Sequence, residues 1–326
     1  MVTGLQIRDA IVRYGSTVAV DGVSLDVQPG TVVGLLGPSG SGKSTLLRAI
    51  AGLEPLAGGS VSWDGVDLAP VKVFKRNFGM VFQDGQLFPT MTVARNIAYG
   101  LGHLSKTEQR DRVAEMLEVV GLPGYGDRRP TELSGGQAQR VALARSLAPS
   151  PRALLLDEPL SALDTGLRRR LADDLARILR ETHTTAVYVT HDHQEAYTIA
   201  DRVAVLVEGR MLQLDDPEVL RRAPASRDVA AFLGARAFIT EHTARELGWE
   251  GTLTTGEVLA VLPGALQVAD DGAEVQVVDQ GYTVDDVEIG VLLPDGQRAV
   301  VSSPERLDSP PSGSASPAAR RSRRNT

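Results

Sequence analysis

Hydrophobic and polar positions alternate with a period of two along the first part of the chain. The alternation covers residues 5–12, 18–27 and 31–36, which glycine and proline separate from one another. Period two is typical of β-strands. After residue 42 the period lengthens to that of a helix, whose apolar face is formed by Leu46, Leu47, Ile50 and Ala51. The chain therefore opens with strands followed directly by a helix.

Helical periodicity dominates the stretch from Met91 to Ala148, with helices expected over residues 92–101, 107–120 and 134–147. The apolar run 153–156 that follows is short enough for a buried parallel strand.

A long helix comes next, with an apolar face formed by Leu167, Leu171, Leu175, Ile178 and Leu179. Residues 186–189 and 203–207 predict two more strands, and Gly209 indicates a hairpin turn. Strands that alternate with helices predict an α/β fold with a largely parallel sheet, into which the all-helical stretch is inserted.

Beyond Gly234 the pattern changes to short strands with Pro-Gly or Asp-Gly at 263–264, 271–272 and 295–296. This pattern predicts a small all-β domain, a barrel or a sandwich. We expect a first domain over 1–234 with a helical subdomain at about 84–150, a β-rich domain over 235–308, and a tail. The tail, 309–326, is rich in Ser, Pro, Ala and Arg, a composition typical of disorder.

Charge is distributed unevenly along the chain. Residues 1–234 carry 27 acidic and 26 basic side chains, 235–308 carry 14 and four, and 309–326 carry four arginines, which gives −1, −10 and +4 and the total of −7. A basic face on the folded part, which nucleic-acid binding requires, is not expected. The chain has no Cys, which excludes disulfides and thiolate metal sites. It has no apolar run of about 18 residues, so we expect no membrane span.

The segment between the third strand and the first helix fits the phosphate-binding pattern G-x-x-x-x-G-K-[ST]. Its glycines allow backbone N–H groups to turn toward a phosphate, and the helix N-terminus adds partial positive charge. Lys43 is expected to reach the β- and γ-phosphates of a nucleotide, and the Ser44 hydroxyl is expected to bind Mg²⁺. The candidate residues are Gly37, Pro38, Ser39, Gly40, Ser41, Gly42, Lys43, Ser44 and Thr45.

Two carboxylates, Asp157 and Glu158, follow the buried strand 153–156. A strand end places such groups at the carboxyl edge of the sheet, where ligands bind in this kind of fold. Asp157 suits Mg²⁺, and Glu158 suits a general base that polarises the attacking water. Alone, the pair would equally fit a solvated strand end; beside a phosphate-binding loop it predicts a catalytic role.

A second glycine-containing helix start lies at Leu133-Ser-Gly-Gly-Gln137. Ser134 is a good N-cap, and Gly135 and Gly136 leave backbone N–H groups accessible at the positive end of the helix. Standing alone, this pattern is more often a loop than an anion site.

Taken together and in this order, the motifs resemble those of the ATP-binding cassette family. The phosphate-binding loop, the Leu133–Gln137 signature, the strand ending in Asp157 and Glu158, the segment 161–164 and Thr190-His191-Asp192 all fall in the family's order. The resemblance implies a P-loop ATPase cassette with an inserted helical subdomain.

The resemblance also implies roles for residues that carry no signal of their own. Tyr14 would stack on adenine, Gln83 would sense Mg²⁺ and couple to membrane subunits, and His191 would contact the γ-phosphate and the attacking water. Ser134, Gly135, Gly136, Gln137 and Asp164 would complete the ATP site of a second copy of the chain. Otherwise Tyr14 would be a core or surface residue, and His191 a capping or exposed one.

Residues 81–93 resemble the corresponding segment of importer ATPases that work with solute-binding proteins, and Phe232-Leu-Gly234 resembles the point where such subunits continue into a small β-domain. The implied partners are a second copy, membrane permease subunits and an extracytoplasmic binding protein. Attachment to the cytoplasmic face of the membrane would be indirect, through the permease.

The solute is the least determined property. The acidic stretch 235–308 favours a cationic or metal ligand on electrostatic grounds. The resemblance of the segment Gln86-Leu-Phe-Pro89 to importer ATPases implies iron(III), with thiamine, polyamines or quaternary amines as alternatives and sulfate and molybdate ranked lower. The acidity alternatively serves only to keep a small domain soluble. A soluble cassette protein of DNA repair or translation and an exporter ATPase are the other classes considered. The single phosphate-binding loop and the missing membrane helices disfavour them.

Overall fold

The computed structural model describes residues 4–83, 87–161, 163–254, 257–262, 264–267, 273–282 and 287–303. Contacts divide the chain into two compact units, of which the first ends at Ala223 and the second begins at Pro224. The tail 309–326 expected from the sequence lies outside the described residues.

A six-stranded sheet forms the centre of the first unit, in the order β10-β9-β3-β8-β7-β6. All neighbours run parallel except β10, which forms the antiparallel hairpin with β9 that Gly209 indicated. The three strands β3, β7 and β8 are buried along their whole length, because helices or strands cover both faces of a parallel sheet. The strands are β3 (Val32–Leu36), β6 (Phe78–Val81), β7 (Ala153–Asp157), β8 (Ala186–Thr190), β9 (Arg202–Val207) and β10 (Arg210–Asp215).

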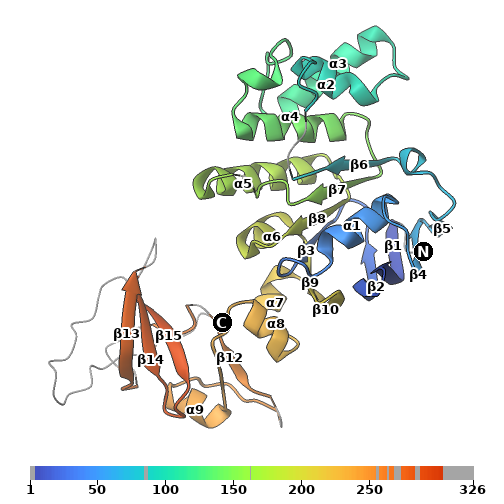
Figure 1. Ribbon diagram of the computed structural model, residues 1–326. Helices are drawn as coiled ribbons and strands as arrows, with labels where there is room; N and C mark the ends of the chain where they lie inside the picture. Colours follow the sequence, from blue (N-terminus) through green and yellow to red (C-terminus); the bar gives the residue numbers. More distant parts are fainter. Residues whose placement is uncertain are drawn as a thin grey trace. The chain divides into compact units, whose positions relative to one another are not determined.

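A second, antiparallel sheet has the order β2-β1-β4-β5 and lies beside the first (Figure 1). Helix α1 (Lys43–Ala51) packs between them, and its apolar side chains at 46, 47 and 50 are fully buried in a core shared by both sheets. The strands are β1 (Leu5–Tyr14), β2 (Thr17–Val27), β4 (Gly58–Trp63) and β5 (Val66–Asp67).

Helices α5 (Thr165–Glu181) and α6 (His193–Ile199) cover the other face of the parallel sheet (Figure 1). At Gly34 of β3 a β-carbon would lie 3.1 Å from the methyl group of Ala200, so glycine allows the end of α6 to approach closely. The short helix α7 (Pro217–Arg222) follows β10 and packs against β9 and β10.

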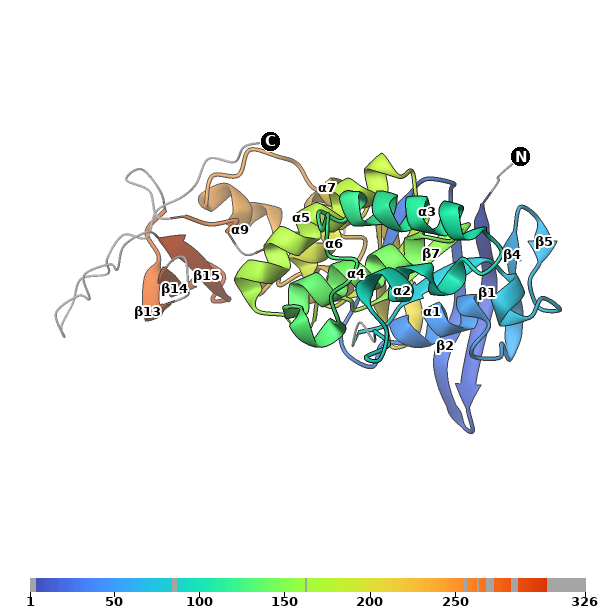
Figure 2. The same ribbon diagram turned by 90° about the horizontal axis from the view of Figure 1, so that it is seen from above.

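Three helices are inserted between β6 and β7, as the sequence predicts: α2 (Val93–Ile97), α3 (Lys106–Val119) and α4 (Gly135–Leu147). Each begins at a Ser or Thr N-cap whose oxygen accepts a backbone N–H. They pack on one another and form a group of their own beside β6 (Figure 1), which lies over the parallel sheet when it is seen from above (Figure 2). The short 3₁₀ turn η1 (Val73–Lys75) lies before this insertion, and two more, η2 (Ala98–Gly100) and η3 (Pro130–Glu132), lie within it.

The second unit contains the strands expected after Gly234, together with two short helices that the sequence did not predict, α8 (Arg227–Phe232) and α9 (Glu241–Glu246). Its sheets, β11-β12 and β13-β14-β15, share one apolar core. Gly296, with φ 80°, forms the predicted turn between β14 and β15; residues 263 and 268–272 lie outside the described residues. The strands are β11 (Ala237–Ile239), β12 (Leu259–Val261), β13 (Gln276–Tyr282), β14 (Val287–Leu292) and β15 (Arg298–Ser303).

A buried arginine joins the elements around α1. The Arg76 guanidinium donates to the backbone oxygens of Ile50, Leu68 and Val71 at 2.8, 2.8 and 3.1 Å. Burial lowers the pKa of Arg76 below its ordinary value.

We expect Arg76→Met to lower the free energy of unfolding by about 3 kcal/mol, because it leaves three carbonyl groups without this donor. In urea denaturation, Arg177→Met should change the free energy of unfolding by less than about 0.5 kcal/mol, since the Arg177 guanidinium pairs only on the surface of α5. If Arg76→Met and Arg177→Met lowered the free energy of unfolding equally, the stabilising role of the buried Arg76 guanidinium would be contradicted.

Candidate functional site

The phosphate-binding loop connects β3 to α1 with a tight backbone path. A β-carbon at Gly37 would lie 2.1 Å from the backbone oxygen of Leu206, and one at Gly42 would lie 2.2 Å from that of Ala19. Gly40 and Gly42 have φ of 80° and 91°, which L-side chains rarely adopt. Glycine is therefore required where the sequence pattern has it, and Pro38, Ser39 and Gly40 stay exposed.

The Lys43 side chain folds back over this loop. Its Nζ donates to the backbone oxygens of Gly37 and Pro38 at 2.8 and 2.9 Å, and the residue is 4% exposed. Burial lowers the pKa of Lys43, while the charges of Glu158 and Asp157 oppose that shift. The ammonium group is thus buried on two carbonyls of the loop and attracted by the charges of Glu158 and Asp157.

The hydroxyl of Ser44, at the start of α1, contacts the carboxylate of Asp157, at the end of β7. Ser44 Oγ donates to Asp157 Oδ1 at 2.5 Å, and Arg48 Nη2 lies 3.7 Å from Asp157 Oδ2. These are hard oxygen donors, which are the ligands that Mg²⁺ takes in nucleotide sites. Ser41 Oγ is buried with no hydrogen-bond partner in the described part of the chain. Both observations fit a loop built for a magnesium–nucleotide complex.

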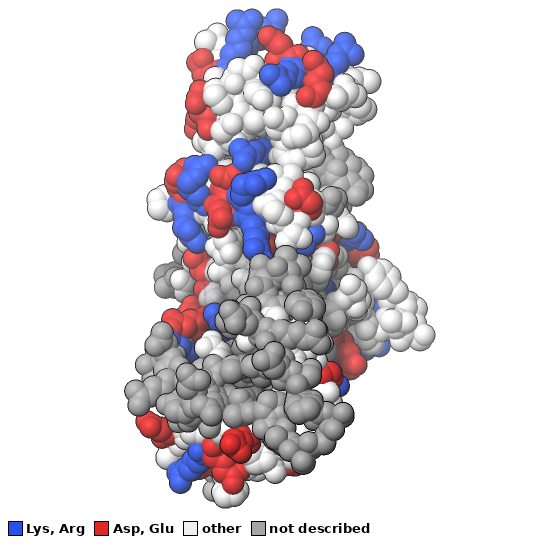
Figure 3. Space-filling model, turned by 90° about the vertical axis from the view of Figure 1, so that its left-hand side faces the viewer, with Lys and Arg blue, Asp and Glu red and all other residues white. Residues whose placement is uncertain are grey.

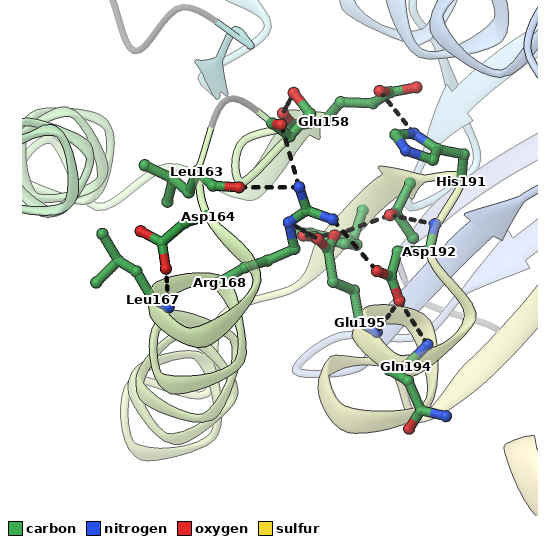
Figure 4. Close-up of polar contacts among 12 residues, drawn as sticks. Glu158, Leu163, Asp164, Leu167, Arg168, His191, Asp192, Gln194 and Glu195 are labelled. Carbon is green, nitrogen blue, oxygen red and sulfur yellow. Dashed lines mark hydrogen bonds and ion pairs between the residues drawn. The ribbon is translucent and has the colours of Figure 1, made fainter. Parts of the chain in front are cut away.

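Glu158 and His191 face each other across the ends of β7 and β8 (Figure 4). Glu158 Oε2 lies 3.0 Å from His191 Nδ1. Glu158 has φ 45°, an uncommon value for a residue other than glycine, and such backbone strain is found mainly at functional sites. Its backbone N–H donates to Val189, and its own oxygen accepts from Ser161, which holds the turn in place. A carboxylate is thereby paired with an imidazole at the edge of the sheet where Lys43 lies.

Two other predicted residues lie at the margins of this site. Gln83 is exposed and lies two residues after Val81, which pairs with Leu156 of β7, the strand that ends just before Glu158. Tyr14 ends β1 with 47% of its surface exposed, on the hairpin whose second strand touches Gly42 through Ala19.

The remaining predicted residues form a second group around the starts of α4 and α5. The Ser134 hydroxyl accepts from Gln137 N, and the Gln137 side chain accepts from Ser134 N. A β-carbon on Gly135 would lie 3.5 Å from Leu163, next to Asp164. Gly136 packs against Leu167 and Leu171, and Asp164 caps α5 by accepting from Leu167 N at 3.0 Å. In this chain Asp164 and Ser134 therefore both act as helix N-caps.

Sequence reasoning missed two charged residues beside Glu158 and His191, namely Arg168 on α5 and Glu195 on α6 (Figure 4). Each occupies a position on the buried face of its helix, one turn before Ala172 and Ile199, respectively. A charge within an apolar helix face signals a buried ion pair. That signal was available in the sequence.

Among the described residues no helix is both long and apolar enough to cross a bilayer. They also contain no group of three or more His, Cys, Asp or Glu side chains arranged to hold a metal ion.

A phosphate-binding loop at the carboxyl edge of a parallel sheet, with an acid–imidazole pair beside it, defines a P-loop nucleotide hydrolase. Residues 20–161 match the family model described as ABC transporter. The chain is 46% identical to an Fe(3+) ions import ATP-binding protein, FbpC, of Streptomyces avermitilis, with 82% of this chain and 80% of that protein covered. The protein of that name from Rhizobium etli is 40% identical over 92% of this chain and 90% of its own length.

A sulfate/thiosulfate import ATP-binding protein, CysA, of Nocardia farcinica is 47% identical over 74% of this chain and 73% of its own. Among solved structures, the ATP-binding cassette MJ0796 in a dimeric post-hydrolysis state with ADP and Pi aligns with a TM-score of 0.58 and 31% identity. The alignment covers 65% of this chain and 98% of that one. The chain belongs to the ABC transporter family and is an ATP-binding ATPase.

Proposed function

We propose that this chain is the ATPase subunit of a binding-protein-dependent importer and that the solute is iron(III). The observation that carries the ATPase site is the Glu158–His191 pair, 3.0 Å apart, at the edge of the sheet that also carries Lys43 and Ser44.

In the proposed reaction, water attacks the γ-phosphorus of ATP and the bond to the bridging oxygen of ADP breaks. Glu158 accepts the proton that the water loses. His191 holds the Glu158 carboxylate and hydrogen-bonds the γ-phosphate. Lys43 exchanges its two loop carbonyls for phosphate oxygens and neutralises charge there.

Ser44, Asp157 and Gln83 are the residues that would hold Mg²⁺, which supplies charge neutralisation at the β- and γ-phosphates. The chemistry of the donor set supports this: a hydroxyl and a buried carboxylate lie in direct contact.

We infer that two copies of the chain are needed for hydrolysis. Ser134, Gly135, Gly136, Gln137 and Asp164 gather at the starts of α4 and α5, apart from the loop that carries Lys43. Two such half-sites on one chain fit an arrangement in which the second group of one copy covers the nucleotide of the other. The dimeric cassette with ADP and Pi is consistent with this arrangement.

The importer assignment and the solute rest on relatives. Fe(3+) appears in the names of relatives that align along most of this chain, whereas other relatives are named for sulfate/thiosulfate and for spermidine/putrescine. The acidic second unit favours a cationic solute or regulator on electrostatic grounds. Contact with the membrane would be made through permease subunits at the cytoplasmic face.

Against a nucleic-acid role, basic and acidic side chains of the first unit lie interspersed on the face shown in Figure 3. On α5, for example, Arg177 pairs with Asp174 and Glu181. Among the described residues of this face, such pairing leaves positive and negative charges mixed, whereas binding to a phosphate backbone favours a continuous basic surface.

Uptake assays test this proposal. In a strain whose own gene carries Glu158→Gln, uptake of radiolabelled iron(III) under iron limitation should fall to the level of a gene deletion, while spermidine, thiamine and sulfate uptake stay unchanged. Glu181→Gln, which alters an exposed carboxylate of α5, should leave iron uptake at the wild-type level. Unchanged iron uptake would overturn the assignment of iron(III), and loss of spermidine, thiamine or sulfate uptake in its place would keep the importer role with a different solute.

A further inference from the structure

Arg168 lies between the two chain segments that carry Glu158 and His191 (Figure 4). Its Nη2 donates to the backbone oxygens of Leu163 and Ser161 at 2.9 and 3.3 Å. On the opposite side, its Nη1 lies 3.5 Å from Asp192 Oδ2, and its Nε lies 3.6 Å from Glu195 Oε1. One guanidinium therefore contacts the turn after β7 and the start of α6.

The contacts on the β7 side lead directly to Glu158. Ser161 N and Ser161 Oγ both donate to the backbone oxygen of Glu158, at 3.2 and 2.9 Å. The Arg168 guanidinium donates to the backbone oxygen of the same serine. The turn that holds Glu158 at its positive φ is thus tied to Arg168 through one residue.

The contacts on the α6 side surround His191. Glu195 is 5% exposed and accepts from the Tyr188 hydroxyl at 2.6 Å and from Thr190 Oγ1 at 2.8 Å. Thr190 Oγ1 in turn accepts from Asp192 N at 3.0 Å. Burial, followed by the charge of Glu195, raises the pKa of Tyr188 well above its ordinary value, so its hydroxyl remains a donor. The residues before and after His191 are therefore fixed in one network.

Arginine suits this position for two physical reasons. Glu195 and Asp192 bring two carboxylates together, and a buried carboxylate needs a nearby cation. A planar guanidinium also directs several N–H groups at once toward two carbonyls and two carboxylates, whereas a lysine ammonium is a single point charge.

We propose that Arg168 is a positioning residue for hydrolysis, which sets the separation and orientation of Glu158 and His191 without touching the nucleotide. The inference rests on the proposed roles of Glu158 and His191.

The test is Arg168→Lys, which keeps the positive charge and removes the planar guanidinium with its several N–H groups. We expect kcat for ATP hydrolysis to fall about 10- to 100-fold, because a misplacement of about 1 Å in a catalytic pair has an effect of this size. The KM for ATP should stay within about twofold, since the loss falls on the transition state rather than on binding. The ring ¹⁵N signals of His191, assigned with His191→Gln, should move while those of His103 and His183 do not.

Arg180→Lys is the matched control, because Arg180 also joins α5 to α6, through the oxygen of Thr198, but far from the 161–163 turn. It should leave kcat, KM and the His191 signals at wild-type values. Glu195→Gln removes the charge from the other side of the network and should reproduce the loss of kcat, which keeps the test usable if Arg168→Lys folds poorly.

Wild-type kcat in both Arg168→Lys and Glu195→Gln would overturn the inference. A loss of kcat in Arg168→Lys while the His191 signals stay unmoved would also overturn the inference. An equal loss of kcat in Arg180→Lys would overturn it too, because either result would indicate a general structural effect. Glu158→Gln and His191→Ala serve as references: if they keep wild-type hydrolysis, the proposed site itself is wrong, independently of Arg168.

Discussion

Glu158→Gln is expected to reduce ATP hydrolysis by about 10²- to 10⁴-fold while leaving ATP binding intact. The carboxamide has nearly the same shape as the carboxylate and still reaches His191, but it does not accept the proton of the attacking water. Two nucleotides would then remain bound between two copies, so the variant should elute as a dimer in size-exclusion chromatography with ATP and Mg²⁺ and as a monomer without them.

Glu181→Gln provides the comparison, because it removes the same charge from an exposed position on α5. It should hydrolyse ATP at the wild-type rate. A Glu158→Gln protein that stays monomeric with ATP and still hydrolyses it quickly would refute both the general-base role and the dimeric site.

Lys43→Ala is expected to weaken ATP binding by about 100-fold or more, because charge-assisted hydrogen bonds to phosphate act in the ground state as well as in the transition state. Titration calorimetry with a slowly hydrolysed ATP analogue measures this loss directly. Lys75→Ala removes an exposed lysine and should bind the analogue like the wild type. Wild-type affinity in Lys43→Ala would show that this side chain has another function.

The phosphate-binding loop and the strand before Asp157 could be predicted because their signals are local. The loop needs glycine within a few residues of a lysine, and β7 is an unbroken apolar run. The contact between Glu158 and His191 depends instead on β7 and β8 being neighbours in the sheet, which spacing along the chain does not determine. The role of His191 was predicted only from the family resemblance, and its contact with Glu158 could be seen only in the structure.

Other features escaped prediction for reasons that the packing explains. Strand β6 is short and contains Gly79, which weakens its strand pattern. A β-carbon there would lie 2.7 Å from the backbone oxygen of Ser146, so glycine is required by the approach of α4. The charge of Arg168 within an apolar helix face was visible in the sequence, but its partners were not, because they lie on a turn and on another helix at sequence separations that follow no motif.

The position of β8 affects the order in which the chain can fold during synthesis. Strand β8 pairs with both β3 and β7, although it is made after them. A nascent chain that ends near residue 161 already contains the phosphate-binding loop, Asp157 and Glu158, but the edges of β3 and β7 that face β8 are then unpaired. Unpaired apolar edges favour aggregation, and the long loop between β3 and β8 must close before the sheet is complete. Residues 186–190 must therefore leave the ribosome before β3 and β7 can be joined in one sheet, and His191 and Leu206, which complete the site, follow later still.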